Sequence, residues 1–219
     1  MNRPEFRLIA AILIGFFLTG CPALWTSETV VKNTPPAQLY READDLFQKK
    51  DYSRAIDAFE RLKSAHPDFQ KTPDAYLKIA DALFQNGAYE KAVSRYHQFI
   101  ELYPLHKEVA RAKYQIALSY FNQIRTADLD NSVVQAALNA FKTLSEDPKA
   151  GEWAKKAEEK FKECQKKLAE KELDKARTYW SMGRYQAARI SAKRVLEEYS
   201  KLGYDAEAND WLKKLKDKK

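Results

Sequence analysis

The sequence has few of the residues that catalytic and metal sites need. Its 219 residues include two cysteines and three histidines, and none of them shows the spacing of a metal site. The six glycines form no phosphate-binding loop and no Gly-x-Ser-x-Gly turn. Adjacent carboxylates such as Asp44 and Asp45 are typical of a solvated surface. We therefore expect a protein that is not an enzyme and that binds no cofactor.

Cysteine is also too scarce for a disulfide scaffold. If Cys21 is modified, as argued below, only Cys164 remains, so the fold must be stable through burial alone. We expect Cys164 to be a small core residue and not a reactive thiol. Few glycines and few β-branched runs, together with abundant Ala, Leu, Lys, Glu and Gln, favour an all-α protein.

The positive charge is not gathered into one large basic region. A formal net charge of +7 arises from 38 basic and 31 acidic residues that are mixed along the chain. Such a mixture is typical of a solvated helical surface and not of a nucleic-acid interface. The Lys-rich tail from Lys213 to Lys219 follows a helical pattern, and positive charge is locally favourable at a helix C-terminus. We expect no nucleic-acid partner.

The one long apolar run, Leu8 to Leu18, is too short to span a bilayer, which takes about 20 apolar residues. Arg3 and Arg7 precede it and small residues follow it, which is the pattern of a secretory signal. An N-terminal core helix or a short anchor is the alternative interpretation.

The residues that close this run, Leu18-Thr19-Gly20-Cys21, resemble the cleavage motif of bacterial lipoproteins. The resemblance implies that residues 1–20 are a removable signal peptide. It also implies that Cys21 carries a covalent diacylglyceryl group and an N-acyl chain. Two or more lipid chains anchor a protein stably. Pro22 stands where an Asp would resemble an inner-membrane retention signal, so the outer membrane is favoured.

The chain after the signal divides into a tether and a repeated body. Residues 21–36 predict a flexible tether, because Thr34-Pro35-Pro36 excludes a helix there. A flexible chain of this length spans roughly 20 Å. We assign residues 37–149 to three N-terminal repeats and residues 150–219 to the C-terminal repeats.

The body contains an internal repeat of 37 residues. Matching pairs are Tyr52 and Tyr89, Ala55 and Ala92, Phe59 and Tyr96, and Pro67 and Pro104. The pattern resembles the tetratricopeptide repeat, in which two antiparallel helices meet through small residues and a Pro closes the unit. The resemblance is carried by Tyr76, Ile79, Ala80, Leu83, Gly87, Tyr89, Ala92, Tyr96, Phe99 and Pro104.

Later repeats follow the same plan with two changes. A third unit begins near Ala110, and its two helices are separated by a long loop, residues 122–132. A fourth unit begins with one long charged helix over residues 152–180, whose favourable i,i+4 pairs include Glu158 with Lys162. The segment from Asp205 onward predicts a final helix that caps the stack. We therefore predict a superhelical solenoid of about four to five repeats.

The first helix of each repeat also carries a stripe of matching residues beside the stripe that packs against its partner helix. An aromatic or apolar residue is followed by a carboxylate in two repeats, and then by a Phe and a side-chain amide. In tetratricopeptide proteins this stripe lines a concave groove. Amides can pair with an extended backbone, so we predict a peptide groove; burial of these rings between repeats is the alternative. The groove residues are Tyr40, Asp44, Phe47, Gln48, Leu77, Asp81, Phe84, Gln85, Tyr114, Phe121 and Asn122.

Three stretches in this order resemble one lipoprotein family. They are YHQFIELYPLHKEVARAKYQIALSYF, the loop led by Ile124-Arg125 before ALNAFKTL, and LAEKELDKARTYWSMGRYQAA. Behind a lipoprotein signal, they resemble the BamD family, also called the ComL or YfiO type. These are lipoproteins of the machine that assembles outer-membrane β-barrels.

The resemblance implies a lipid-anchored scaffold on the periplasmic face of the outer membrane. Members of the family hold the POTRA domains of the BamA-like barrel insertase through their C-terminal repeats. They receive the C-termini of unfolded outer-membrane proteins near their N-terminal repeats. Other assembly lipoproteins are further expected partners. The partner-interface residues implied by the resemblance are Arg125, Asp128, Tyr185, Arg189 and Arg194.

The chain departs from the family pattern at two places. Arg125 is followed by Thr126-Ala127-Asp128 instead of Asp-Gln-Thr, and Ile190-Ser191 replace Asn-Arg. The insertase contact is then expected to use neighbours such as Arg189 or Arg194. An alternative function is that of a periplasmic repeat lipoprotein that scaffolds peptidoglycan or envelope-constriction machinery. Such proteins usually carry a coiled-coil segment before the repeats, and none is visible in this sequence.

Overall fold

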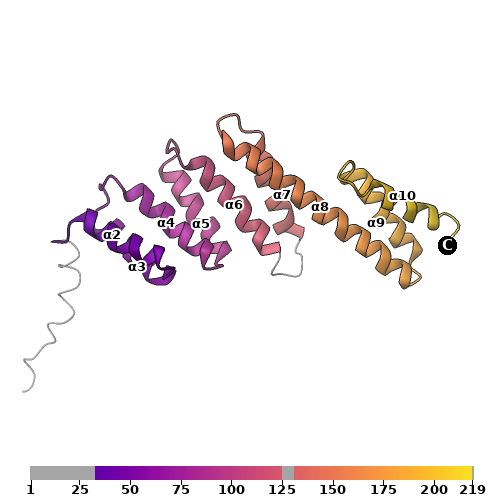
Figure 1. The fold of residues 1–219 in the computed structure, drawn as a ribbon, viewed down its shortest axis with the longest axis horizontal. Helices are drawn as coiled ribbons and strands as arrows, with labels where there is room; N and C mark the ends of the chain where they lie inside the picture. Colours follow the sequence, from indigo (N-terminus) through magenta and orange to yellow (C-terminus); the bar gives the residue numbers. More distant parts are fainter. Residues whose placement is uncertain (1–32, 125–130, 219) are drawn as a thin grey trace, which may run out of the picture. The chain divides into compact units, whose positions relative to one another are not determined.

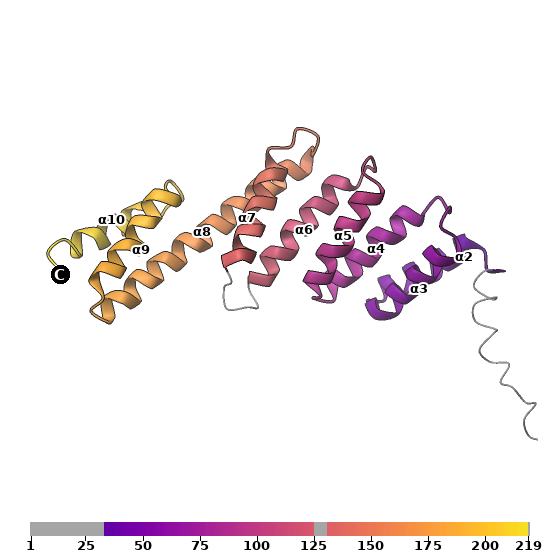
Figure 2. The ribbon, with the colours of Figure 1, turned by 180° about the vertical axis from the view of Figure 1, so that it is seen from behind.

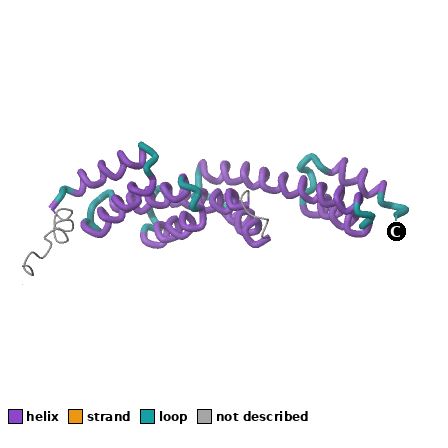
Figure 3. The backbone as a smooth tube through the Cα atoms, turned by 90° about the horizontal axis from the view of Figure 1, so that it is seen from below, coloured by secondary structure: helices purple, strands orange, loops and turns teal. Residues whose placement is uncertain are grey.

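The computed structural model describes residues 33–124 and 131–218, and over these residues the chain forms helices and loops without strands (Figures 1 and 3). This confirms the all-α prediction for the described part. The helices are α2 (Pro36–Gln48), α3 (Tyr52–Ala65), α4 (Thr72–Gln85), α5 (Tyr89–Leu102), α6 (Val109–Ile124), α7 (Asn131–Ser145), α8 (Glu152–Ser181), α9 (Tyr185–Glu198) and α10 (Asp205–Lys214).

The chain forms two compact units, Met1–Ala75 and Tyr76–Lys219, and the boundary falls inside α4. Each unit is described by itself. Among residues 33–124 and 131–218, no helix is both long and apolar enough to cross a bilayer.

Three helix pairs are joined by the same left-handed turn. Gly87 follows α4 with φ +75° and Gly183 follows α8 with φ +71°. The amide N–H groups of Gly87 and Ala88 donate to the carbonyl oxygens of Phe84 and Leu83, which satisfies the end of α4. Lys50 holds the equivalent position after α2 with φ +61°, although it is not a glycine. Turn geometry is therefore kept even where the sequence lacks the residue that suits it best.

In the first unit, α2 and α3 pack through small residues and aromatic contacts. Ala43 and Ala55 are fully buried, which allows the two helices to approach closely. Phe59 is also fully buried, and its ring meets the edge of the Tyr40 ring at 5.6 Å between centroids. The Asp51 side chain accepts from the Arg54 backbone N–H and caps α3.

In the second unit, α4 and α5 pack against α6 around buried Ala80, Ala92 and Ala112. The next cluster joins α6, α7 and the first half of α8, and both Phe141 and Cys164 are buried in it. Burial raises the pKa of the Cys164 thiol to about 11, so this cysteine is a protonated core residue at neutral pH.

The long helix α8 lies beside α7 along its first half and beside α9 along its second half (Figures 1 and 2), and it contributes residues to two hydrophobic clusters. Its first half packs on α6 and α7, whereas its second half places Ala169 and Leu173 against Val195 of α9 and Ala208 of α10. The prediction of one helix over residues 152–180 is confirmed, since α8 spans Glu152–Ser181. The predicted loop 122–132 is shorter at both ends, because α6 continues to Ile124 and α7 begins at Asn131.

Candidate functional site

In the first unit, the predicted groove residues lie along α2. The Tyr40 ring has the Lys71 ammonium 4.9 Å from its centroid, and the Phe47 ring meets the edge of the Tyr52 ring at 5.5 Å. Burial, together with the negative charges of Asp74 and Asp44, raises the pKa of Tyr40 to about 12. Tyr40 and Phe47 are half-buried, and Gln48 is exposed. These residues keep a partly open apolar and amide surface.

The α4 residues of the predicted groove divide between core and surface. Leu77 is only 4% exposed and belongs to the core cluster of α4, α5 and α6, so its assignment to an open groove was wrong. Phe84 is half-buried, with its ring 5.4 Å from that of Tyr89, and Gln85 is exposed. Leu77 is buried because α6 covers this side of α4 in addition to α5.

Asp81 is part of a polar network that links three helices of the second unit. The Tyr96 hydroxyl of α5 donates to Asp81 Oδ1 at 2.6 Å. The Arg111 guanidinium of α6 donates to both Asp81 oxygens at 3.1 and 3.0 Å. Arg111 also donates to Glu108 at 2.7 Å. Asp81 therefore fastens α4 to α5 and α6, and the prediction that it lines a peptide groove gave it the wrong role.

Two donors of this network, Tyr96 and Arg111, are kept protonated by their surroundings. Burial and the Asp81 carboxylate raise the pKa of Tyr96, so its hydroxyl keeps its proton and stays a donor. Burial by itself would lower the pKa of Arg111, but its hydrogen bonds to Asp81 and Glu108 raise it. Two parallel N–H donors on one carboxylate also fix the geometry of the pair.

The α6 residues of the predicted groove also divide between core and surface. Phe121 is 6% exposed and packs on Phe141 at 6.3 Å, so its assignment to the groove surface was wrong as well. The Lys167 ammonium of α8 lies 4.7 Å from its ring centroid. Helix periodicity identified the stripe, but it carried no information that α8 would cover Phe121. The half-buried residues at the two remaining positions are Tyr114 and Asn122.

Two of the predicted partner-interface residues already have intramolecular partners. Arg189 donates to the backbone oxygens of Leu215 at 2.5 Å and Lys218 at 3.1 Å, which holds the end of α10 against α9. Arg194 donates to Glu172 of α8 at 3.3 Å. A third, Tyr185, packs its ring edge on Trp180 at 5.2 Å. The last two predicted interface residues, Arg125 and Asp128, lie outside the described residues, as does the predicted lipid-bearing Cys21.

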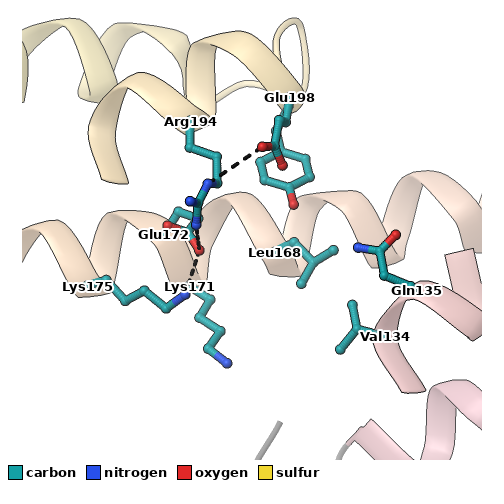
Figure 4. A pocket seen from close by; sticks show the side chains of 9 residues that line it. Val134, Gln135, Leu168, Lys171, Glu172, Lys175, Arg194 and Glu198 are labelled. Atoms are coloured by element: carbon teal, nitrogen blue, oxygen red, sulfur yellow. Dashed lines mark hydrogen bonds and ion pairs between the residues drawn. The ribbon is translucent and has the colours of Figure 1, made fainter. Parts of the chain in front are cut away.

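A pocket of about 400 Å³ between α7, α8 and α9 was missed by the sequence analysis (Figure 4). Its wall combines apolar, amide and charged groups from three consecutive helices. Its lining includes Val134, Gln135, Leu168, Lys171, Glu172 and Arg194. No local motif marks these residues, because the long helix α8 brings them together only when it packs on both neighbours.

Residues 33–124 and 131–218 contain no cluster of three or more His, Cys, Asp or Glu side chains that could hold a metal ion. The family of the chain follows instead from its similarity to known proteins over most of its length. The sequence profile of the YfiO family, described as "Outer membrane lipoprotein", matches residues 32–215. This chain belongs to the YfiO family.

Relatives of the chain carry a consistent name. The "Outer membrane protein assembly factor BamD" of Rickettsia prowazekii is 31% identical over 203 residues, which cover 92% of this chain and 80% of that protein. The protein of the same name from Caulobacter vibrioides is 27% identical over 208 residues, covering 94% of this chain and 68% of that protein. The family resemblance read from the sequence is thus confirmed.

Solved structures that match the chain include a thermophilic TPR (tetratricopeptide repeat) protein of Thermus thermophilus. It has a TM-score of 0.43 and 17% identity, and the alignment covers 81% of this chain and 99% of that one. The TPR2AB domain of yeast Sti1 has a TM-score of 0.46 and 13% identity, with 82% of this chain and 69% of that one covered.

Proposed function

We propose that this YfiO-family chain is an outer-membrane lipoprotein that acts as a scaffold in the assembly of outer-membrane β-barrel proteins. The observation that carries the proposal is the profile match over residues 32–215, together with relatives that are named as assembly factors. Consecutive helices packed in pairs support a scaffolding role, because repeated helix pairs present surfaces for binding other chains.

The proposed anchor is the lipid on Cys21, which would hold the repeats on the periplasmic face of the outer membrane. The apolar run and the Leu-Thr-Gly-Cys motif support this placement. Replacing Cys21 by Ala should leave the protein uncleaved or release it from the outer membrane. Fractionation of membranes, followed by immunoblotting, measures this. Normal retention of the Cys21→Ala protein in the outer membrane would refute the anchor.

The proposed substrate is the C-terminal segment of an unfolded outer-membrane protein, bound near the N-terminal repeats. Support comes from the members of the stripe that remain partly or fully open. On α2 these are Phe47 and Gln48, and on α4 they are Phe84 and Gln85. A Phe next to an amide offers an apolar contact for a side chain and hydrogen bonds for an extended backbone.

The substrate proposal is tested with a fluorescent peptide that ends in Phe. The Phe84→Ala variant should bind it more weakly, by about 1.5 kcal/mol, because the ring is half-buried before binding. Fluorescence anisotropy gives the dissociation constant. Leu102→Ala is the matched control, since Leu102 is an exposed apolar residue on α5 outside the stripe. An unchanged constant for Phe84→Ala would assign the stripe to the core.

The proposed protein partner is the POTRA-bearing insertase, held by the C-terminal repeats. The residues proposed for this contact lie on α9, where Tyr185 and Arg189 are half-buried and Ile190 is 59% exposed. Arg194 lies on the same helix and is only half-buried. Other assembly lipoproteins are proposed as further partners.

The whole proposal is tested by isolating the tagged, lipidated protein from outer membranes in mild detergent. Mass spectrometry then identifies the proteins recovered with it. Stoichiometric recovery of a POTRA-bearing barrel is the expected result. Recovery of peptidoglycan synthases or envelope-constriction proteins instead would assign the same fold to the alternative scaffold.

A further inference from the structure

The end of α8 and the end of α10 meet in a cluster of aromatic rings. The centroid of the Trp180 ring lies 5.2 Å from that of Tyr185 and 5.9 Å from that of Trp211. All three side chains are half-buried, so each keeps part of its surface in solvent. Figures 1 and 2 show the turn between α8 and α9 beside the C-terminal end of α10. Packing has therefore gathered three rings at one end of the second unit.

An exposed apolar side chain lies in the same turn. Met182 is the C-terminal cap residue of α8, and it is 61% exposed. A Cβ atom added to the neighbouring Gly183 would meet no atom within 4 Å, so the turn stands clear of the other described residues. Methionine is flexible and adapts its shape to irregular apolar surroundings. The turn thus offers an apolar tip next to the rings.

Three cations surround the rings. The Lys214 ammonium lies 4.8 Å from the Trp211 centroid, and the Lys218 ammonium lies 5.8 Å from the centroids of the other two rings. Arg189 donates to the Lys218 backbone oxygen at 3.1 Å, which holds this last turn in place. Arg184, in the turn after α8, is exposed. A cation over a ring keeps its charge, so these groups remain available to an anion.

Carboxylates do not cancel this positive charge. Among the residues that the structure describes, none of the three cations forms an ion pair with a carboxylate. Glu207 of α10 is already paired with Arg177 at 2.6 Å. Residues 210–218 contain four lysines and two aspartates, so the end of the described chain has an excess of positive charge.

This combination of groups matches the interface of an anionic bilayer. Trp and Tyr are favoured at the level of the lipid headgroups, because their rings are apolar and also carry a hydrogen-bond donor. Lysines beside them lay their apolar stems along the rings and extend their charge toward the phosphates. An exposed apolar tip suits a fluid phase that closes around it, whereas a folded partner would need a pocket of matching shape.

We propose that this end of the second unit rests on the surface of an anionic membrane. Met182 and the open part of the Trp180 ring enter the headgroup region. Arg184, Lys214 and Lys218 pair with lipid phosphates, since an anionic surface attracts each basic side chain near it. The contact goes beyond the proposed function, and none of these five residues belongs to the partner interface proposed above.

The test attaches a fluorophore to the turn through Met182→Cys, in the protein as isolated from membranes. Burial raises the pKa of the Cys164 thiol to about 11, so this thiol does not compete for the label. The protein is reconstituted into vesicles of phosphatidylethanolamine and phosphatidylglycerol that carry a quencher at headgroup level. The matched control is the same label introduced by Leu105→Cys, because Leu105 is 98% exposed on another turn of the same unit. Quenching should be about threefold stronger at Met182 than at Leu105, and equal quenching would overturn the proposal.

The charge of the surface is tested separately. Neutral vesicles of phosphatidylcholine should reduce the quenching at Met182 to the level of the control position. In anionic vesicles, Lys214→Gln combined with Lys218→Gln should lower the equilibrium constant of the contact about thirtyfold. Lys142→Gln combined with Lys149→Gln is the matched control, because it removes two exposed lysines elsewhere in the unit. An equal loss in both double variants, or undiminished quenching in neutral vesicles, would refute the membrane contact.

Failure of this contact and failure of the proposed function give different results. Loss of the proposed anchor on Cys21 would lower the amount of protein that floats with the vesicles, but it would leave the difference in quenching between Met182 and Leu105. Shielding of the label at Met182 only after a solubilised POTRA-bearing barrel is added would assign this surface to a partner protein and overturn the membrane contact.

Discussion

The first and second repeats hold their helices together in different ways at equivalent positions. In the first repeat, Tyr40 of α2 meets Phe59 of α3 through ring edges. In the second, 37 residues later, Leu77 replaces the Tyr and Tyr96 replaces the Phe, so the hydroxyl now lies on the second helix. There it donates to the Asp81 carboxylate.

The charges at these positions differ as well. Arg111, which holds Asp81 from the following helix pair, corresponds 37 residues earlier to Asp74 on α4, so an acid stands where the base would be needed to hold Asp44 of the first repeat. The first repeat therefore lacks two of the three groups that form the network. The comparison shows that the two repeats share only the small residues between their helices, such as Ala55 and Ala92, and the left-handed turn at Lys50 and Gly87. The additional energy between helices comes from an apolar contact in one unit and from an ion pair in the other.

The largest expected effect comes from breaking the network at its centre. Asp81→Ala leaves the Arg111 guanidinium and the Tyr96 hydroxyl without their acceptor. We expect a loss of about 3 kcal/mol in the free energy of unfolding. This is at the low end for a buried pair, because the Arg111 and Asp81 side chains keep 22% and 15% exposure.

Urea unfolding followed by circular dichroism measures this loss. Arg111→Gln and the double variant complete a double-mutant cycle, and the two single effects should not add. A loss below about 0.5 kcal/mol for Asp81→Ala, the size of an ordinary surface change, would contradict the role of the network.

A smaller effect is expected when the second repeat is made like the first by Tyr96→Phe. The change removes one charge-assisted hydrogen bond but leaves the Asp81–Arg111 pair, so we expect a loss of about 1.5 kcal/mol. Tyr89→Phe, at a half-buried ring, is the control and should change the free energy by less than about 0.5 kcal/mol. Equal effects of the two changes, measured by urea unfolding, would show that the Tyr96 hydroxyl adds nothing.

The two turns give a smaller and opposite pair of effects. Lys50 and Gly87 are equivalent and both have positive φ, which costs a side chain about 1 kcal/mol. Part of this is offset by the greater freedom of Gly in the unfolded chain, so Lys50→Gly should stabilise by about 0.5 kcal/mol. Gly87→Lys should destabilise by a similar amount, since a Cβ there meets no atom within 4 Å. Thermal unfolding of both variants checks the signs, and two shifts of the same sign would exclude backbone strain as the cause.

The last predicted effect is a loss of stability at high pH, caused by the raised pKa values of Tyr40 and Tyr96, and it is absent at neutral pH. The pKa of Tyr40 is raised to about 12 and that of Tyr96 is raised as well, whereas an unfolded Tyr ionises near pH 10. Below pH 10 both states are protonated and stability is unaffected; as the pH rises above 10, only the unfolded state releases protons, and stability falls. The urea midpoint should decrease between pH 10 and 11.5, and less steeply in Tyr96→Phe. Parallel curves would show that Tyr96 is not shielded.

Much of the fold was readable because it depends on local patterns. Ala55 and Ala92 stand 37 residues apart at positions where two helices must touch, and Gly87 marks the turn that follows α4. The long helix α8 was predicted to within one residue at its end, since charged i,i+4 pairs and an apolar seam continue without a break.

The residues of the candidate site were harder to predict from the sequence, because the exposure of a side chain depends on which other helices cover its stripe. Leu77 and Phe84 lie seven residues apart on the same helix, yet the first is buried under α6 and the second stays half-open. Asp81 looked like a groove residue because its partner, Arg111, stands 30 residues away in the next repeat. Periodicity gives the direction of a side chain on its own helix and not its partner on another.

The sequence by itself determined the repeat, the extent of the long helix α8, the membership of the family and the motif around Cys21, since each depends on residues close together or on a fixed period. The tertiary structure decided the rest. It brought Asp81 to Arg111, covered Phe121 with α8, and placed the buried Glu172 in a pocket between three helices. The physical reason is that burial and hydrogen bonding depend on distances between helices, which only packing sets.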